Sequence, residues 1–402
     1  MRTTNNDIWM RLKHIKAGHF RTLFMFMVVM PWALMGRLWG KNVWLISERF
    51  DQARDNGYCF YKYVRENYPT QKIIYIIDKS APDYRKICRY KTVIQHNSWM
   101  HYYYYCLSKL HISAHVIGCA PHNSRPFARM LKSILSIKDV FLPHGVSYGV
   151  TEFCLKKNAL IDLFICSGYP EYKNVLDNYG YSEKEVAYTG FPRLDLWHEV
   201  RPNKKQLLIM PTWRVYIAQD SETDFCDTTY FKVYQALIND ERMERYLETN
   251  DLELVFYLHN EMQKYANFFH TTCLNIKIIQ PSDECDIQEL LKTSALLVTD
   301  YSSVHFDFAY MNKPVIYYQF DKEEFFSKQY AQSEFNAETD GFGLVLYEKE
   351  PLIDEIMSCV NHEYVVEQRY HERMRNFYQL YDNHNCERVY QAIMDRCAAD
   401  WK

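Results

Sequence analysis

Short apolar runs alternate with longer patterned segments along most of the chain. In the first half these runs predict strands at residues 42–48, 72–78, 110–115, 139–144, 163–167 and 186–190. A second series predicts strands at residues 206–212, 252–259, 276–281, 295–300 and 314–319. Helix-like segments separate the runs, and this alternation is typical of parallel sheets built from β-α-β units. The pattern therefore predicts an α/β protein with two doubly wound domains.

The two series divide the chain of 402 residues into four parts. The predicted linker lies within residues 196–205, so we assign 42–200 to a first Rossmann-like domain and 201–365 to a second. Residues 1–41 form a separate basic and apolar segment, and residues 366–402 are predicted to be helical. A chain of this length is sufficient for two α/β domains of ordinary size.

Residues 1–41 combine seven Arg or Lys side chains with a single acid, Asp7. The apolar run at residues 22–36 is shorter than the roughly 20 residues that a spanning helix needs, and Pro31 interrupts it. No small-residue cleavage site follows, which argues against a secretory signal. Cationic flanks around an apolar helix favour a segment that lies on an anionic membrane surface. The alternative is a buried first helix of the domain.

The composition argues against several classes of function. A formal net charge of -3 gives no global reason to expect nucleic-acid binding. The twelve cysteines contain no CxxC pair, so we expect reduced structural thiols. The chain has no P-loop, no GxGxxG after the first strand, no HExxH and no DxD. The DECD sequence at residues 283–286 precedes a predicted helix and is expected to cap it, so no cofactor is assigned, and a divalent cation such as Mg²⁺ stays open.

Ligands of open parallel sheets bind at the carboxyl ends of the strands, so the residues after each apolar run are the candidates. One run ends in Thr299 and Asp300, and Ser302 and Ser303 then begin a predicted helix. Free amides and the positive end of the helix dipole would bind phosphate there. Plain helix capping by serine is the alternative. Asp300 and Thr299 at the same strand end favour a ligand site.

Histidines follow two other strands. His144 and Gly145 end a run of the first domain, where a neutral imidazole can act as general base towards an alcohol. The glycine allows a ligand or another backbone to approach closely. His259 ends a run of the second domain, where a cation would pair with the charge of a diphosphate. A histidine hydrogen-bonded within its loop is the alternative for each.

Two further motifs supply candidates. Thr212 and Arg214 follow the first strand of the second domain, and arginine can bind phosphate oxygens in a bidentate manner. The sequence TGFPRLD places Arg193 and Asp195 after the last strand of the first domain, beside the predicted cleft. A surface turn is the alternative for the second motif.

Taken together these motifs resemble those of the CDP-glycerol glycerophosphotransferase family, the polyol-phosphate transferases of teichoic-acid and capsule synthesis. The resemblance rests on HG after a strand, TGFPRLD, MPTWR, YLH and DIQELLKTSALLVTDYSSVHFDFAYMNKPVIYYQF, and it covers about residues 42–356. It implies a GT-B architecture, with an acceptor domain and a CDP-donor domain around a cleft. It also implies transfer of an alditol phosphate, glycerol phosphate in the first instance, from CDP-glycerol or CDP-ribitol to a hydroxyl of a lipid-linked glycan, with release of CMP. The implied location is peripheral, at the cytoplasmic face of the cell membrane.

Carried over by position, the resemblance assigns His144 as the base and His259 as the histidine of the donor phosphates. It places Arg214, Asp300, Ser302 and Ser303 in the donor-binding motifs. Where the family often has threonine and proline after HG, this chain has valine and serine, so the alditol, the acceptor and the choice between primase and polymerase stay open. The alternatives are a GT-B glycosyltransferase that uses a nucleotide sugar and a membrane-bound scaffold without activity.

Overall fold

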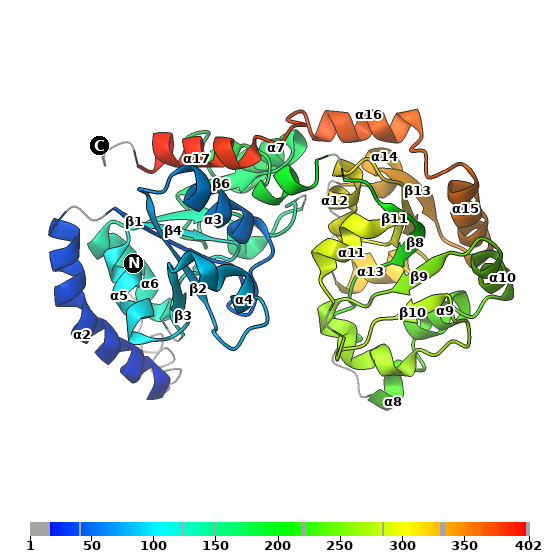
Figure 1. The fold of residues 1–402 in the computed structure, drawn as a ribbon, viewed down its shortest axis with the longest axis horizontal. Coiled ribbons are helices and arrows are strands. Elements are labelled where there is room, and N and C mark those ends of the chain that lie inside the picture. The colour runs from blue at the N-terminus through cyan, green and yellow to red at the C-terminus, as the bar shows by residue number, and fades with distance from the viewer. Residues whose placement is uncertain are drawn as a thin grey trace.

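A computed structural model describes residues 17–39, 42–122, 124–147, 149–198, 200–218, 222–283, 285–329 and 335–398. In this part of the chain two parallel sheets form two α/β domains that lie side by side (Figure 1). The predicted α/β class with two parallel sheets is confirmed. Of residues 1–41, positions 1–16, 40 and 41 lie outside the described residues, as does position 284 of the DECD sequence.

The first sheet has the strand order β3-β2-β1-β4-β5-β6-β7, with every neighbouring pair parallel. Its strands are β1 (Val43–Ser47), β2 (Lys72–Ile77), β3 (Val93–Gln95), β4 (Leu110–Ser113), β5 (Lys138–Phe141), β6 (Leu163–Cys166) and β7 (Val186–Tyr188). Its helices are α2 (Ala17–Leu38), α3 (Asn56–Asn67), α4 (Tyr84–Ile87), η1 (Cys88–Tyr90), α5 (Trp99–Leu107), α6 (Arg125–Leu135), η2 (Glu152–Cys154), α7 (Tyr169–Asn178) and η3 (Pro192–Leu196).

The second sheet repeats this topology in the order β10-β9-β8-β11-β12-β13. Its strands are β8 (Asn203–Ile209), β9 (Glu253–Phe256), β10 (Ile276–Ile278), β11 (Ser294–Thr299), β12 (Val315–Tyr318) and β13 (Gly343–Leu346). Its helices are α8 (Glu222–Phe225), α9 (Thr229–Leu237), α10 (Glu241–Thr249), η4 (Asn260–Phe268), α11 (Ile287–Thr293), α12 (Val304–Tyr310), α13 (Lys322–Lys328), α14 (Ala337–Asp340) and α15 (Lys349–Asn361).

The apolar runs produce these sheets because parallel strands are covered on both faces. All positions of β1, β4, β6, β11 and β12 are buried, so neither face needs polar residues. The two strands that the runs did not predict, β3 and β13, both lie at sheet edges. All three residues of β3 are only half-buried, and β13 begins with a glycine, so neither shows a strong apolar signal.

The two domains share one buried apolar cluster. It extends from Trp44 on β1 through Phe191 and Trp197 to Phe306 on α12. Two C-terminal helices, α16 (Gln368–Phe377) and α17 (Asn385–Arg396), complete the connection. Helix α16 crosses from the second domain towards the first, where α17 packs (Figure 1). The predicted helical end of the chain is thus two helices with different partners.

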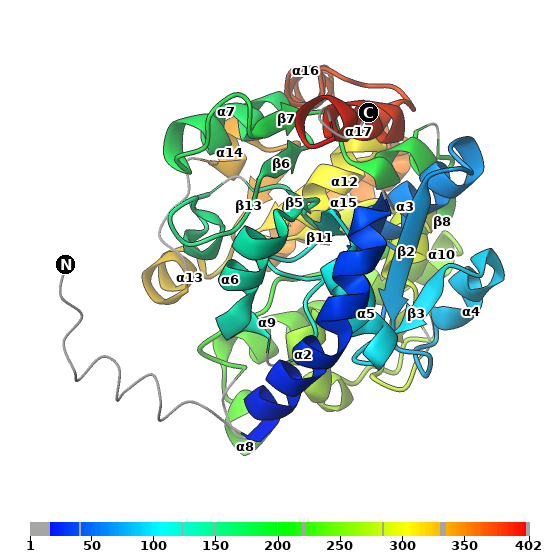
Figure 2. The same cartoon turned by 90° about the vertical axis from the view of Figure 1, so that its left-hand side faces the viewer.

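Helix α2 lies along α5 on the outside of the first domain (Figure 2). It continues through Pro31, which is exposed, so the proline that interrupts the apolar run does not interrupt the helix. One face of α2 is buried through Phe26, Val29 and Ala33, and Thr22 Oγ1 lies 3.3 Å from Tyr102 OH on α5. By length and composition, α2 is the one helix of the described residues that could cross a membrane.

Candidate functional site

The carboxyl ends of the two sheets meet at the loop after β5 and the start of α12. Gly145 of the first domain approaches Ser303 of the second so closely that a Cβ at position 145 would lie 2.9 Å from Ser303 Oγ. Burial is the main cause that lowers the pKa of His259, and a smaller electrostatic contribution from His144 places this imidazole in the same region. The structure therefore brings together three residues from distant motifs, His144, His259 and Ser303.

Two buried side chains hold the loop that carries His144. Asn56, in the first turn of α3, donates from Nδ2 to the carbonyl oxygen of Pro143 at 2.7 Å. On the other side of the loop, Glu171 Oε1 accepts from the Ser147 amide at 2.6 Å. The His144 side chain between these anchors is exposed, and its ring centroid lies 5.5 Å from that of His115. An exposed imidazole on a fixed loop can reach a substrate hydroxyl.

Glu171 is a positioning residue that the sequence motifs did not reveal. Its Oε2 accepts from the Ser167 amide at 2.6 Å, so one carboxyl group joins the loops after β5 and β6. The side chain is fully buried, and burial raises its pKa to about 7. A carboxylate accepts at both oxygens, whereas a glutamine accepts at only one.

Glu171→Gln should therefore loosen the His144 loop. We expect kcat to fall by up to about 100-fold, as misplacement of a catalytic group by about 1 Å can cause, while the KM for the nucleotide donor stays nearly constant. Steady-state kinetics at pH 8 would measure both constants. Glu185→Gln, which removes a half-buried carboxylate bonded to Lys156 in the same domain, is the matched control. An unchanged kcat in Glu171→Gln would contradict the positioning role.

His259 lies at the end of the segment after β9 and caps η4. Its Nδ1 accepts from the Glu261 amide at 3.3 Å, and its ring stacks near Trp213 with centroids 6.0 Å apart. Because Nδ1 is an acceptor, the proton of the neutral ring lies on Nε2. Burial lowers the pKa of His259, which favours the neutral ring, with its proton on Nε2, in the absence of a ligand.

We expect the binding of a ligand with a diphosphate group beside His259 to add a proton to this side chain. The pKa of the free side chain is lowered by burial, and a diphosphate beside the ring would raise it again. Affinity should therefore rise as the pH falls through the pKa of the complex and level off below the pKa of the free protein. Calorimetric titrations in buffers of different ionisation enthalpy would measure the proton uptake, and His259→Gln should abolish it. Proton release on binding would contradict this assignment.

Arg214 and Asp300 form a buried ionic cluster with Asp321. Arg214 donates from Nε to Asp321 Oδ2 at 2.7 Å and from Nη2 to Asp300 Oδ2 at 2.8 Å. Its side chain is 0% exposed, and that of Asp300 is also 0% exposed. The geometry thus gives no support to direct contact between Arg214 and a phosphate. Its role here is to hold Asp300, and the sequence motifs did not identify Asp321, which follows β12.

Asp300 in turn fixes the two segments next to it. Its Oδ1 accepts from the amides of Thr212 at 2.8 Å and of Tyr301 at 2.6 Å. Thr212 is buried, and its hydroxyl has no hydrogen-bond partner among the described residues. The cluster therefore fixes the segments that follow β8 and β11, and the second of these segments leads directly into the two serines.

Ser302 and Ser303 lead into α12. The Ser303 side chain is exposed and makes no capping hydrogen bond to the helix, while Ser302 Oγ is 3.5 Å from the Val304 amide. The plain capping alternative is thus poorly satisfied at Ser303. Its hydroxyl lies instead beside Gly145 of the other domain.

Arg193 and Asp195 take structural positions rather than the cleft positions predicted for them. Arg193 is 2% exposed and donates to Asp55 of the first domain at 2.9 Å and to Asp307 of the second at 2.7 Å. Asp195 accepts from the Asn385 amide at 2.8 Å and caps α17. The first residue joins the two domains, and the second fixes the C-terminal helix to the first domain.

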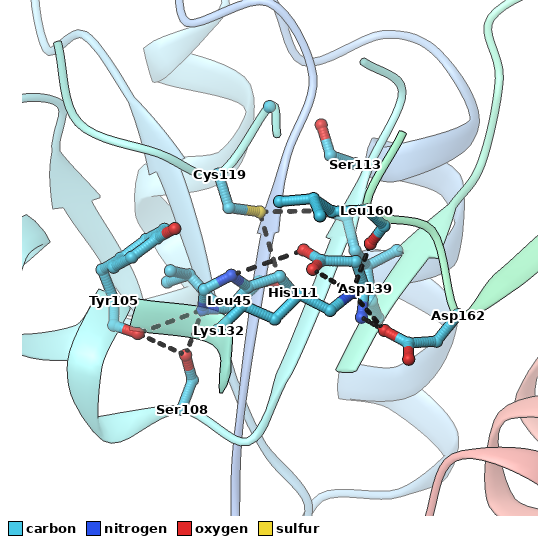
Figure 3. Close-up of polar contacts among 12 residues, drawn as sticks. Leu45, Tyr105, Ser108, His111, Ser113, Cys119, Lys132, Asp139, Leu160 and Asp162 are labelled. Carbon is cyan, nitrogen blue, oxygen red and sulfur yellow. Dashed lines mark hydrogen bonds and ion pairs between the residues drawn. The ribbon is translucent and has the colours of Figure 1, made fainter. Parts of the chain in front are cut away.

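A separate, partly buried polar cluster lies near the amino ends of β4 and β5 (Figure 3). Lys132 contacts Asp139 at 2.8 Å and Asp162 at 2.5 Å, and His111 Nε2 lies 2.9 Å from Ser108 Oγ. Asp139 and His111 are near the amino ends of β5 and β4, away from the strand ends that carry His144. These charges are paired, and we interpret the cluster as part of the fold.

The cysteines and the acidic sequence before α11 show no metal site. All twelve cysteines are free thiols, and no group of three His, Cys, Asp or Glu side chains in the described ranges could hold a metal ion. Asp286 accepts from the Gln288 amide at 3.0 Å and pairs with Lys86 at 3.0 Å. This capping role of Asp286 is the one that the sequence predicted.

Comparisons with known proteins agree with the motifs. The chain is 33% identical over 370 residues to the minor teichoic acid biosynthesis protein GgaB of Bacillus subtilis (strain 168), which covers 88% of this chain and 40% of that protein. It is 28% identical over 170 residues to the teichoic acid ribitol-phosphate polymerase TarL of Staphylococcus aureus (strain NCTC 8325 / PS 47), covering 37% and 27% of the two chains. The chain thus spans less than half the length of these relatives.

Solved structures show the same fold. The wall teichoic acid polymerase TagF superposes with a TM-score of 0.63 at 16% identity, over 96% of this chain and 98% of that chain. This likeness shows that the GT-B arrangement predicted from the motifs is correct. The family model for CDP-glycerol:poly(glycerophosphate) glycerophosphotransferase matches residues 27–395. The chain therefore belongs to the CDP-glycerol:poly(glycerophosphate) glycerophosphotransferase family.

Proposed function

We propose that the protein transfers an alditol phosphate from a CDP-activated donor to a hydroxyl of a lipid-linked acceptor and releases CMP. The observation that carries this proposal is the approach of the His144 loop of one domain to the Ser303 helix start of the other. Relatives bear the names of ribitol-phosphate and glycerol-phosphate polymerases, and one solved structure of TagF follows a soak with CDPG. These relatives support a donor of the CDP-alditol class.

The chemistry asks for positioning and charge stabilisation more than for a covalent nucleophile. The acceptor oxygen attacks the phosphorus that bears the alditol, the bond from that phosphorus to the CMP oxygen breaks, and His144 takes the hydroxyl proton. His259 Nε2–H and the Ser303 hydroxyl donate to the diphosphate, where negative charge accumulates on the leaving CMP. The buried Arg214–Asp300 pair keeps the chain before Ser303 in place without contacting the substrate.

A donor panel tests the proposal. The protein is incubated with a lipid-linked acceptor and, in parallel, CDP-glycerol, CDP-ribitol or UDP-sugars, and release of CMP or UDP is followed. We expect CMP release, with glycerol as the first candidate alditol and ribitol as the second. UDP release alone would instead establish the alternative, a GT-B glycosyltransferase that uses a nucleotide sugar.

We further propose that α2 attaches the protein to the cytoplasmic face of the cell membrane. Its exposed face is apolar, with Phe24, Met27 and Trp32 each about 60% exposed. Its other face packs on α5 along most of its length, through residues from Thr22 to Gly36. A helix held in this way can lie in a membrane interface with its outer face among the lipids.

The triple variant Phe24→Glu/Met27→Glu/Trp32→Glu should lose affinity for anionic vesicles by at least about 100-fold, because each substitution removes about 1.5 kcal/mol of apolar burial. Co-sedimentation with vesicles would measure this. Leu274→Glu/Tyr347→Glu/Val365→Glu adds the same charge at exposed apolar positions of the second domain and is the matched control. Equal binding by both triple variants would place the attachment elsewhere.

A further inference from the structure

The first domain contains a cavity of about 830 Å³. None of the residues assigned to donor binding lies in its lining. Its walls come from the segments that follow β1, β2, β3 and β4, at the carboxyl edge of the first sheet. Strands β1 and β4 are neighbours in the sheet although two strands separate them in the chain. This is the switch point at which open α/β sheets bind ligands. The volume is within the range of small-molecule sites.

One wall of the cavity is aromatic. The rings of Phe50 and His96 stack with centroids 3.6 Å apart and an interplanar angle of 13°. His122 stands on edge against His96, with centroids 4.6 Å apart at 79°. The faces of such rings can cover the C–H surface of a sugar or polyol, while the ring nitrogens remain as hydrogen-bonding groups.

One ring nitrogen of the buried His96 side chain is unpaired among the described residues. It lines the cavity, it is only 8% exposed, and its Nε2 has no hydrogen-bond partner among the described residues. Burial lowers its pKa to about 4, so the ring is neutral near pH 7. Buried polar groups are normally hydrogen-bonded, and a ligand hydroxyl would supply the missing partner.

The charges of the lining favour an uncharged ligand. Asp51 and Asp78 contribute carboxylates, whereas Arg49 is the one arginine or lysine among the lining residues. Glu48 also lines the cavity, but its buried carboxyl group accepts from the backbone amides of residues 54, 55 and 58. Arg49 already lies 3.6 Å from Asp51. A phosphate or a diphosphate would meet more carboxyl groups than cations, but hydroxyl groups can donate to carboxylates.

The cavity lies between α2, the proposed membrane helix, and His144, the proposed base for the acceptor hydroxyl. His19 of α2, the proposed membrane helix, lines it, and so does His115. The His115 ring lies 5.5 Å from that of His144, the proposed base. A molecule anchored in the membrane beside α2 could therefore place a hydroxylated unit in the cavity and its terminal hydroxyl at His144.

We propose that this cavity binds an uncharged sugar or polyol unit of the acceptor, with His96 and the Phe50 wall as its recognition elements. The proposal rests on the proposed function for the identity of the ligand as an acceptor, but the binding site itself is tested without turnover. No lining residue belongs to the second domain, which separates the cavity from the donor motifs.

Saturation-transfer NMR with methyl α-glucoside and with ribitol as probes tests the site on the full chain. We expect at least one of these probes to bind the unaltered protein and His96→Phe to weaken that binding at least about tenfold, because the variant keeps the ring stack and loses Nε2. His270→Phe, at an exposed histidine before β10, is the matched control and should bind normally. Asp51→Ala, at an exposed position of the rim, provides a second variant if His96→Phe does not fold, and should weaken binding at least threefold.

Three outcomes would overturn the proposal. The first is that neither probe binds, and the second is that both variants bind as tightly as the control. The third is that CDP displaces the probe, which would make the cavity part of the donor site. The NMR result does not depend on the donor panel. Probe binding with no CMP release would therefore refute the proposed function and leave a polyol site, whereas CMP release without probe binding would refute the cavity alone.

Discussion

Replacing His144 with alanine is expected to lower turnover by about a hundred- to ten-thousand-fold, the usual contribution of a general base. Donor affinity should stay within about twofold, because the imidazole acts on the acceptor hydroxyl. The fold should persist, since the side chain is exposed and Asn56 and Glu171 hold the loop through backbone atoms of its neighbours. CMP release and calorimetric titration with CDP-glycerol would separate the two effects.

The matched control for His144→Ala is His270→Ala. His270 is exposed and lies in the loop before β10, at the amino edge of the second sheet. Its replacement should leave both turnover and donor affinity unchanged. Turnover of the His144 variant within about threefold of the unaltered protein would remove this residue from the mechanism.

Replacing Arg214 with methionine is expected to lower the free energy of unfolding by about 3–5 kcal/mol, the usual effect of removing one partner of a buried ion pair. Asp300 and Asp321 would lose their cation while 0% and 5% exposed. Donor affinity should fall as well, because Arg214 holds Asp300, which fixes the Tyr301 amide directly before Ser302. Urea unfolding followed by circular dichroism would measure the stability.

Arg245→Met is the control for this loss of charge. Arg245 pairs with Glu241 on the surface of α10, with both side chains more than 70% exposed, and such pairs contribute only about 0–1 kcal/mol. If Arg214→Met does not fold at all, Arg214→Lys, which restores a charge without the bidentate geometry, should fold with intermediate stability. A change below 1 kcal/mol in Arg214→Met would show that the two carboxylates do not depend on the arginine.

The sequence was sufficient for those features that depend on neighbours in the chain. Apolar runs predicted eleven strands, and the residues after them supplied His144, His259 and Ser303, which the structure brings together. Burial and long-range pairing could not be predicted in this way. Arg193 and Asp307 are 114 positions apart, and nothing near either residue indicates that the other neutralises it.

The same limit explains the charged residues whose roles differ from the prediction. Arg214 has the type and position of a phosphate ligand, but Asp321 lies 107 positions away and accepts its hydrogen bonds. Asp195 also comes shortly after a strand, but the residue whose amide it accepts from, Asn385, is 190 positions away. A strand-end position predicts that a side chain is near the site, and only its partners decide whether it is free to bind a ligand.

The return of α17 to the first domain has a consequence for synthesis of the chain on the ribosome. The first domain needs residues of α17, capped by Asp195, so it stays incomplete while the second domain, which begins at β8, is being made. About 180 residues separate the two parts, which is on the order of 10–40 s of translation at 5–20 residues per second. During that interval the surface that α17 covers, including Trp44 beside Tyr390, is exposed on the nascent chain. We therefore expect that the second domain can fold before the first is finished. We also expect ribosome-associated chaperones to bind the nascent chain at the surface that α17 later covers.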